Sequence, residues 1–381
     1  MPVQGYFDLT FESVKEAFAQ LFENDQQRGA ALCVQIAGET VIDLWAGTTD
    51  RERSQAWQQD TLVNVFSSTK PFAAVVLMQL VAEGKLELDA PVSQYWPEFV
   101  AKGKQDISVR HLLSHRSGIS AIHQSLPAES LYHWQAMVQA IEQETPWWTP
   151  NTTHGYAPIT YGWLVGELIR RVDGRMPGDA IAARICQPLN LDFFVGTPAS
   201  EFYRISDVSR MKGDIGDEAA QRMLQTIMRE PNSLTTKSFT NPPSVMTSTN
   251  KPEWRLMQQP AANGHGNARS LAQFYTALLN NSLLEQKYLL EMCKEHSFGM
   301  DKTMLTSTRI GLGLMLDQTN TENATYGMTA SAFGHPGAGG TTAFADPQLN
   351  LSFSFVTNSL GPYVLMDPRA QRLARLVKAV L

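Results

Sequence analysis

The 381-residue chain has few cysteines, no long apolar run and no excess of clustered charge. Its three cysteines, Cys33, Cys186 and Cys293, are widely spaced and odd in number, so they match neither a disulfide framework nor the ligand spacing of a zinc site. Free cysteines are typical of a reducing compartment. No apolar stretch reaches the length of about 20 residues that a membrane-spanning helix needs.

The charge pattern also excludes classes of partner. The formal net charge is −6, and the lysines and arginines are scattered, which argues against a nucleic-acid-binding face. The N-terminal stretch 1–8 has neither the basic segment nor the apolar segment of a signal peptide. We therefore expect a soluble cytoplasmic protein without nucleic-acid or membrane partners.

Composition and periodicity together predict the arrangement of the chain. Hydrophobic residues make up 43% of it and charged residues 18%, enough for a sizeable core. Apolar spacing predicts helices over 11–22, 161–172, 271–279 and 368–380, and one that begins near residue 70. β-rich runs predict strands over 30–36, 40–45, 311–316, 341–345 and 351–357. Strands near both ends with helices between them indicate one sheet interrupted by a helical region, in which the Pro/Ser/Thr/Asn-rich stretch 231–260 is expected to form a long ordered loop.

The motif Ser67-x-x-Lys70 carries the strongest chemical signal in the chain. A serine hydroxyl is a weak nucleophile and needs a base beside it. Residues three apart share a helix face, so Lys70 would point at Ser67 in the first turn of the predicted helix. The positive N-terminus of that helix would favour an oxyanion. The motif alone is equally compatible with Ser67 as an ordinary helix N-cap.

A second match to this pattern has a different context. Ser248 and Lys251 have the same spacing, but they lie in the stretch 231–260, where no helix pattern follows. The chain has no Gly-x-Ser-x-Gly segment, so a nucleophile elbow of the α/β-hydrolase type is not expected. Ser67 is the better candidate nucleophile.

Four longer segments resemble the serine β-lactamase-like family. Residues 89–99 and 107–118 are similar to segments of this family, which contains class C β-lactamases, penicillin-binding carboxypeptidases and family VIII carboxylesterases. Residues 148–167 and 263–272 most resemble the esterase branch. The resemblance implies an α/β (α+β) fold of the β-lactamase/transpeptidase-like type, with an antiparallel sheet flanked by helices and an inserted helical domain. We expect a sheet domain of residues 1–70 and 286–381, a mainly helical domain of residues 71–285, and the active site in the cleft between them.

The second motif of the family, Tyr-x-Asn, corresponds to Tyr156-Ala157-Pro158. A tyrosine can act as a base only where positive charge, here that of Lys70, stabilises its phenolate. Without the resemblance, Tyr156 reads as a half-buried aromatic residue before a helix, and Tyr161 is a rival phenol. The resemblance implies that Pro158 replaces an amide that orients the side-chain amide of β-lactams, which argues for substrates without that group.

The third motif, Lys-Thr-Gly on a strand, corresponds to His335-Pro336-Gly337. Gly337 lets a substrate approach the strand closely, and the resemblance implies an oxyanion hole formed by the backbone N–H groups of Ser67 and Ala338. A histidine that titrates near pH 6–7 would attract a substrate carboxylate less strongly than a lysine. The same sequence is also compatible with an ordinary tight turn.

Other candidate residues carry weaker signals. His111 and His115 are four residues apart, but without the intervening glutamate of a metalloprotease and without a third ligand, so we expect helix-cap and packing roles and no metal. Trp148, which follows Trp147, is a candidate wall of an acyl pocket or an ordinary core residue.

These residues predict a serine hydrolase that cleaves a small-molecule, short-chain carboxylic ester without a cofactor. Ser67 would attack the ester carbonyl, and Tyr156, coupled to Lys70, would take the proton and return it to the leaving alcohol. The same groups could serve a β-lactamase, a D-amino-acid peptidase or an acyltransferase. Because the second and third motifs are altered, a non-catalytic binding protein remains an alternative. The joint presence of Ser67, Lys70 and Tyr156 argues against it.

Overall fold

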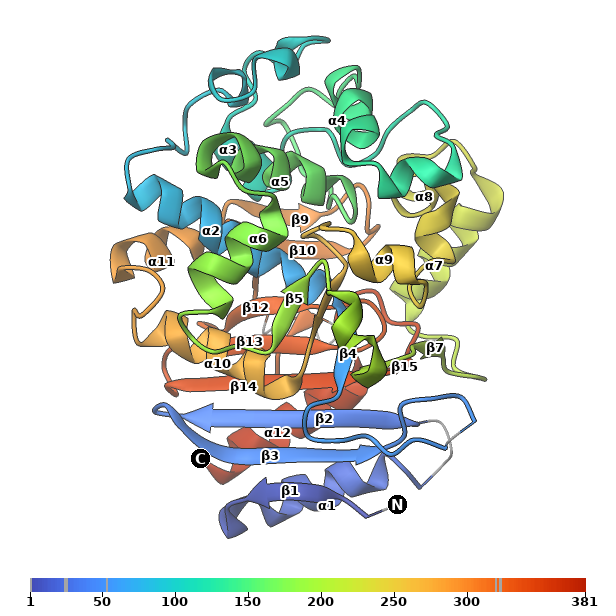
Figure 1. Cartoon of the computed structure of the whole chain (residues 1–381), viewed down its shortest axis with the longest axis vertical. Helices are drawn as coiled ribbons and strands as arrows, with labels where there is room; N and C mark the ends of the chain where they lie inside the picture. Colours follow the sequence, from blue (N-terminus) through green and yellow to red (C-terminus); the bar gives the residue numbers. More distant parts are fainter. Residues whose placement is uncertain (1, 24–26, 53, 319–320, 322–323) are drawn as a thin grey trace.

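The computed structural model describes residues 2–23, 27–52, 54–318, 321 and 324–381. Within these ranges, nine strands form the main antiparallel sheet. The strands are β1 (Gln4–Phe7), β2 (Gly29–Ile36), β3 (Glu39–Gly47), β9 (Ser297–Met300), β10 (Ser307–Ile310), β11 (Met315–Leu316), β12 (Phe333–Pro336), β13 (Thr342–Asp346) and β14 (Leu351–Thr357). Their order is β1-β3-β2-β14-β13-β12-β11-β10-β9, so the two ends of the chain build one sheet (Figure 1).

Helices cover both faces of this sheet. α1 (Glu12–Gln20) and α12 (Pro368–Val380) pack against each other on one face, and α10 (Ala268–Leu279) packs on β2, β13 and β14. Successive residues of a strand point to opposite faces. Accordingly, Leu32 of β2 belongs to the core with α1 and α12, and its neighbour Cys33 belongs to the core with α10.

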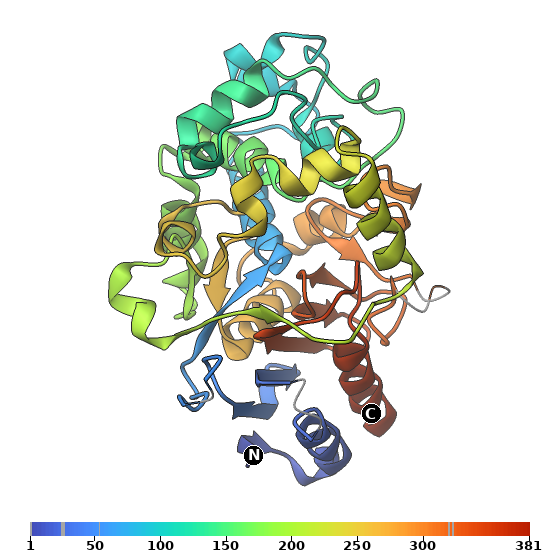
Figure 2. The ribbon, with the colours of Figure 1, turned by 90° about the vertical axis from the view of Figure 1, so that its right-hand side faces the viewer.

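The middle of the chain is mainly helical, and α2 (Lys70–Ala82) is its central element. The sequence of α2 is apolar on all sides, which is typical of a fully buried helix, and nearly all of its residues are buried. It packs against α5 (Thr160–Asp173) and lies near the centre of the view in Figure 2. The other helices of the middle region are α3 (Val109–Leu113), α4 (Trp134–Glu142), α6 (Pro177–Ile181), α7 (Glu218–Arg229), α8 (Leu234–Thr240), α9 (Pro252–Leu256) and α11 (Gln286–Met292).

A small second sheet supports the start of α2. Its strands are β4 (Leu62–Phe66), β5 (Phe193–Val195), β6 (Ile205–Ser206) and β8 (Gly264–Gly266), in the order β5-β8-β4-β6. Phe193 of β5 stacks on Phe72 of α2, with ring centroids 3.9 Å apart. β4 runs directly into a 3-10 turn, Ser67–Thr69, and then into α2. β5, β6 and β8 are only two or three residues long, too short for a sequence pattern to predict.

Most of the predicted elements are confirmed. The helices expected over 11–22, 161–172, 271–279 and 368–380 and the strands expected over 30–36, 40–45, 341–345 and 351–357 are present within a few residues. The strand expected over 311–316 is wrong for its first part, because a turn at Gly313 (φ +70°) leaves only β11 at its end.

The loop expected over 231–260 is also wrong in part, because it contains α8 and α9. Ser233 caps α8 by accepting a hydrogen bond from the Thr236 N–H, and Pro252 fits the first turn of α9. The boundary between the helical domain and the sheet domain at residue 286 stays a prediction. α10 lies before this boundary and packs on the main sheet.

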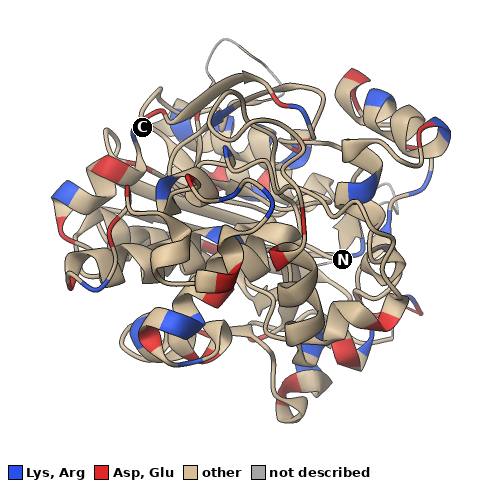
Figure 3. Cartoon of the chain, turned by 90° about the horizontal axis from the view of Figure 1, so that it is seen from above, with Lys and Arg blue, Asp and Glu red and all other residues tan. Residues whose placement is uncertain are grey.

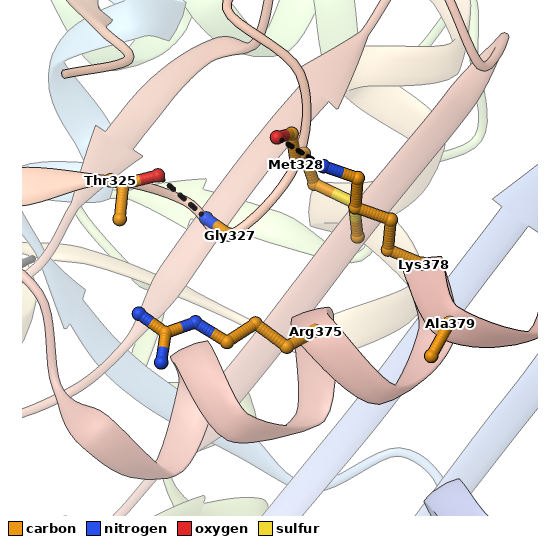
Figure 4. A pocket seen from close by; sticks show the side chains of 6 residues that line it. All are labelled: Thr325, Gly327, Met328, Arg375, Lys378 and Ala379. Carbon is orange, nitrogen blue, oxygen red and sulfur yellow. Dashed lines mark hydrogen bonds between the residues drawn. The ribbon is translucent and has the colours of Figure 1, made fainter. Parts of the chain in front are cut away.

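Acidic and basic residues are interspersed along the ribbon in the view of Figure 3. A surface pocket of about 570 Å³ lies between the end of α12 and residues 325–328 (Figure 4). Its Lys378 ammonium donates to the Met328 carbonyl oxygen at 2.9 Å, and no candidate site residue lines it. Among the described residues, no helix is long and apolar enough to cross a membrane.

Candidate active site

The turn between β4 and α2 presents Ser67 at the surface and Lys70 beneath it. Ser67 is partly exposed, whereas Lys70 is fully buried. Phe66, just before the turn, has φ +49°, a conformation that costs a non-glycine residue about 1–3 kcal/mol. Thr69 holds this backbone, because its hydroxyl donates to the Phe66 carbonyl and accepts from the Gly264 N–H at 3.0 Å. The Ser67 side chain caps neither the turn nor α2, so the N-cap interpretation is wrong.

The side-chain nitrogen of Lys70 contacts three oxygens. Its Nζ lies 3.1 Å from Ser67 Oγ and 3.0 Å from each of the backbone carbonyl oxygens of Pro158 and Ala261. Burial lowers the pKa of Lys70 well below its usual value, because the charged form loses its hydration. In the neutral amine, two N–H groups satisfy the two carbonyls and the lone pair is left for the Ser67 hydroxyl. This geometry makes Lys70 a candidate base for Ser67.

Gln259 holds the backbone beside the two carbonyls that contact Lys70. Its side-chain N–H donates to the Ile159 carbonyl oxygen at 2.7 Å, one residue after Pro158. Its side-chain oxygen accepts from the Ala261 N–H at 3.0 Å and from the Ala262 N–H, in the same peptide as the Ala261 carbonyl, at 2.9 Å. Sequence reasoning missed Gln259 and Ala261, and their only signal is that they adjoin the segment 263–272, which resembles the esterase branch.

Tyr156 lies against Lys70 and Ser67. Lys70 Nζ is 4.6 Å from the centroid of the Tyr156 ring, and the Tyr156 hydroxyl is 3.4 Å from His335 Nε2. Burial raises the pKa of Tyr156 well above its ordinary value, and a hydrogen bond with Ser67 opposes that shift. Tyr161 is equally buried, but its hydroxyl has no hydrogen-bond partner within the described ranges. Of the two rival phenols, only Tyr156 is joined to Ser67.

The backbone around Tyr156 is held by two side chains. Asp301 is fully buried and its carboxylate accepts from the Tyr156 N–H at 2.9 and 3.0 Å. His115 Nδ1 accepts from the Ala157 N–H at 3.1 Å, and its ring centroid lies 4.8 Å from that of Tyr156. His111 forms a capping box with Ser108, so the cap and packing roles expected for the two histidines are observed. Asp301 gave no signal in the sequence.

His335 is a neutral hydrogen-bonding group in this site. Its Nδ1 lies 2.7 Å from the Pro336 carbonyl oxygen, which can only accept, so Nδ1 carries the proton and Nε2 faces the Tyr156 hydroxyl as an acceptor. Burial lowers the pKa of His335 to about 3, because the charged ring would lose its hydration. The expectation that His335 titrates near pH 6–7 is therefore wrong, because its ring is shielded from water.

The segment after His335 lies against the Ser67 turn. The Ser68 hydroxyl donates to the His335 carbonyl oxygen at 2.9 Å. A Cβ atom at Gly337 would lie 2.2 Å from the Val65 carbonyl oxygen, so only glycine allows this approach. Ala338 follows at the surface. The structure thus brings Gly337 and Ala338 to the turn that carries Ser67, and the oxyanion hole stays a prediction.

The remaining candidates lie at the edge of the site or outside it. Trp148 is partly exposed and its Cη2 edge lies over Gly155, next to Tyr156. Trp147 instead stacks on His123, with ring centroids 3.8 Å apart. The structure brings together Ser67, Lys70, Tyr156 and His335, with Trp148 nearby.

Comparisons with known proteins match the whole chain. The family described as Beta-lactamase matches residues 14–378. "Esterase/beta-lactamase LipL" of Mycobacterium tuberculosis is 29% identical over 96% of this chain and 85% of its own length. A penicillin-binding protein homologue from Caulobacter crescentus is 35% identical with a TM-score of 0.90, and a family VIII carboxylesterase is 30% identical with a TM-score of 0.88. Each of these two structures aligns over 100% of both chains.

Proposed function

Because the chain belongs to the beta-lactamase family and is a serine hydrolase with that fold, we propose that it cleaves short-chain carboxylic esters through an acyl-enzyme on Ser67. The observation that carries this proposal is the buried Lys70 amine, shared between Ser67 Oγ and two backbone carbonyls. A buried, deprotonated lysine is an effective base for a serine nucleophile.

The arrangement supports a division of the proton transfers between two groups. Lys70 takes the Ser67 proton as Oγ attacks the ester carbonyl. Burial raises the pKa of Tyr156, so its phenol stays protonated between steps. Its hydroxyl gives a proton to the leaving alcohol and recovers one from the Lys70 ammonium, which returns Lys70 to the neutral amine. This differs from the sequence-based hypothesis that Tyr156 takes the first proton. Water then attacks the acyl-enzyme, Lys70 takes the proton of the water, and the proton returns through Tyr156 to Ser67 Oγ as the acid leaves.

Two features favour esters over β-lactams. Pro158 has no side-chain amide, and its carbonyl oxygen is occupied by Lys70. His335 is uncharged, so the strand of the third motif presents no fixed cation for a substrate carboxylate. The similarity to a family VIII carboxylesterase points the same way.

The test compares esters with a β-lactam and locates the acyl group. We expect efficient hydrolysis of p-nitrophenyl butyrate, slow hydrolysis of nitrocefin, and mass-spectrometric detection of a fluorophosphonate adduct on the peptide that contains Ser67. The matched control is Ser248→Ala, which should label normally, whereas Ser67→Ala should not label. A wild type that prefers nitrocefin would point to a β-lactamase, and one that neither turns over nor labels would point to a binding protein.

A further inference from the structure

A buried ion pair lies behind the turn that follows His335. Arg369, in the first turn of α12, pairs with Asp367 at 2.7 Å, and their side chains are 13% and 1% exposed. The guanidinium uses all of its donors on protein oxygens. Besides both Asp367 oxygens, it donates to the carbonyl oxygens of Gly339 and Ser359 at 3.0 and 2.9 Å and to the Gln27 side chain at 2.7 Å. This arginine therefore has no donor left for a substrate carboxylate.

The turn is shaped to receive this pair. Gly339 and Gly340 have φ values of +88° and +118°. A Cβ atom at Gly340 would lie 2.6 Å from both Arg369 Nη2 and Asp367 Oδ2, so only glycine fits there. The carbonyl oxygen of Gly339 also accepts from the Gly361 N–H at 2.9 Å. The peptide between Gly339 and Gly340 is thus fixed from two sides.

Two peptide units connect Arg369 to Ala338. The Gly339 carbonyl that Arg369 binds belongs to the same peptide as the Gly340 N–H, which donates to the Gly337 carbonyl oxygen at 3.2 Å. That carbonyl in turn shares its peptide with the Ala338 N–H. In a trans peptide the C=O and N–H groups point in opposite directions. Hydrogen bonds in such a series polarise one another, so the Arg369 N–H donor at one end strengthens the Ala338 N–H donor at the other, although Asp367 offsets much of the guanidinium charge.

We propose that Arg369, held by Asp367, is a positioning residue that aims and polarises the Ala338 N–H as an oxyanion donor through the Gly337–Gly340 turn. The inference rests on the proposed esterase function. In this proposal Arg369 supports the oxyanion donor and does not bind the substrate. Loss of Arg369 should therefore lower kcat and leave KM nearly unchanged.

The test uses a matched pair of arginines. Arg184 pairs with Asp173 at 2.6 Å, with side-chain exposures of 14% and 1%, and it binds Glu83 at the far end of α2 from Ser67. Arg369→Gln and Arg184→Gln should therefore lower the melting temperature by similar amounts. Because removal of an oxyanion donor costs about 10²–10³ in kcat, its misplacement in Arg369→Gln should lower kcat for p-nitrophenyl butyrate about 10- to 100-fold. Arg184→Gln should change kcat less than about twofold.

A thionoester separates an oxyanion effect from general damage. Wild type should favour p-nitrophenyl butyrate over its thionoester, because sulfur fits the oxyanion hole poorly. Arg369→Gln should lose much of this preference, Arg369→Lys should recover part of it, and Arg184→Gln should keep it. Equal losses on both substrates, or a kcat for Arg369→Gln that matches Arg184→Gln, would overturn the inference while leaving the esterase proposal intact. A wild type without ester hydrolysis would overturn the esterase proposal and, with it, this inference.

Discussion

The spacing Ser-x-x-Lys occurs at residues 67–70 and again at residues 248–251, and the two copies have opposite environments. Lys70 is fully buried and its Nζ lies 3.1 Å from Ser67 Oγ. Lys251 is exposed, and the Ser248 hydroxyl is bonded to the Ser244 carbonyl and the Tyr132 hydroxyl. The motif alone therefore creates no base. The proposed base depends on burial of the lysine and on carbonyls that hold it against the serine.

The largest effect that would test this comparison is on the nucleophile. Ser67→Ala should reduce hydrolysis of p-nitrophenyl butyrate to background, because loss of the nucleophile removes the covalent route. Ser248→Ala should keep kcat within about twofold and should lower only the melting temperature, since a buried hydrogen bond is worth about 1 kcal/mol. Steady-state kinetics and thermal unfolding of both variants would check this. Substantial turnover by Ser67→Ala would place the nucleophile elsewhere.

The next effect concerns the two lysines and pH. Lys70→Met should lower kcat about 10²–10⁴-fold, the usual contribution of a general base, and Lys251→Met should leave it unchanged. The folded-state pKa of Lys70 is depressed, so the neutral amine should form as pH rises through that value. In wild type, kcat should therefore fall toward acid pH as Lys70 becomes protonated. A Lys70→Arg variant with an unchanged pH–rate profile would contradict this assignment.

Substitution of the two tyrosines beside Lys70 should change kcat less than substitution of Ser67 or Lys70. Tyr156→Phe removes the hydroxyl that faces Ser67 and His335, and should lower kcat about 10²-fold. Tyr161→Phe removes a hydroxyl without a partner among the described residues and should change kcat less than about threefold. Single-turnover measurements would show whether acylation or deacylation is slowed. The reverse order of effects would mean that the wrong phenol has been chosen.

The smallest effect concerns His335. Because its pKa is lowered to about 3, it should stay neutral from pH 5 to 9, and the preference of wild type for ester over nitrocefin should not change with its titration. His335→Lys should move that preference toward the carboxylate substrate by about tenfold, the lower value of one charge-assisted hydrogen bond. Ratios of kcat/KM at two pH values would check both statements. A wild-type preference that follows a titration near pH 6.5 would show that His335 is more hydrated than its burial implies.

Much of the fold could be predicted from local pattern. The strand over 351–357 and the helix over 368–380 have the expected bounds, because long periodic segments specify both type and length. Short elements could not be predicted in this way. α8 and α9 were missed because their stability comes from a Ser233 cap, a Pro252 first turn and contacts with distant segments.

The candidate site could be predicted only in part. The positions of Ser67 and Lys70 follow from helical spacing, and Tyr156 and His335 were expected from a resemblance to a family. Asp301, Gln259 and Arg369 could not be predicted from the sequence, because each bonds to backbone groups of residues remote in the chain.

The sequence by itself determined that Ser67 and Lys70 share a helix face, because a spacing of three is a local property of any helix. It also determined which strands and helices could form. Only the tertiary structure decided that Lys70 is buried against Ser67 with a lowered pKa, as the proposed base requires. The carbonyls that hold it come from residues 88 and 191 positions away, and burial by the surrounding core removes the water that would keep it charged. Lys251 has the same spacing from its serine, but it is exposed to water.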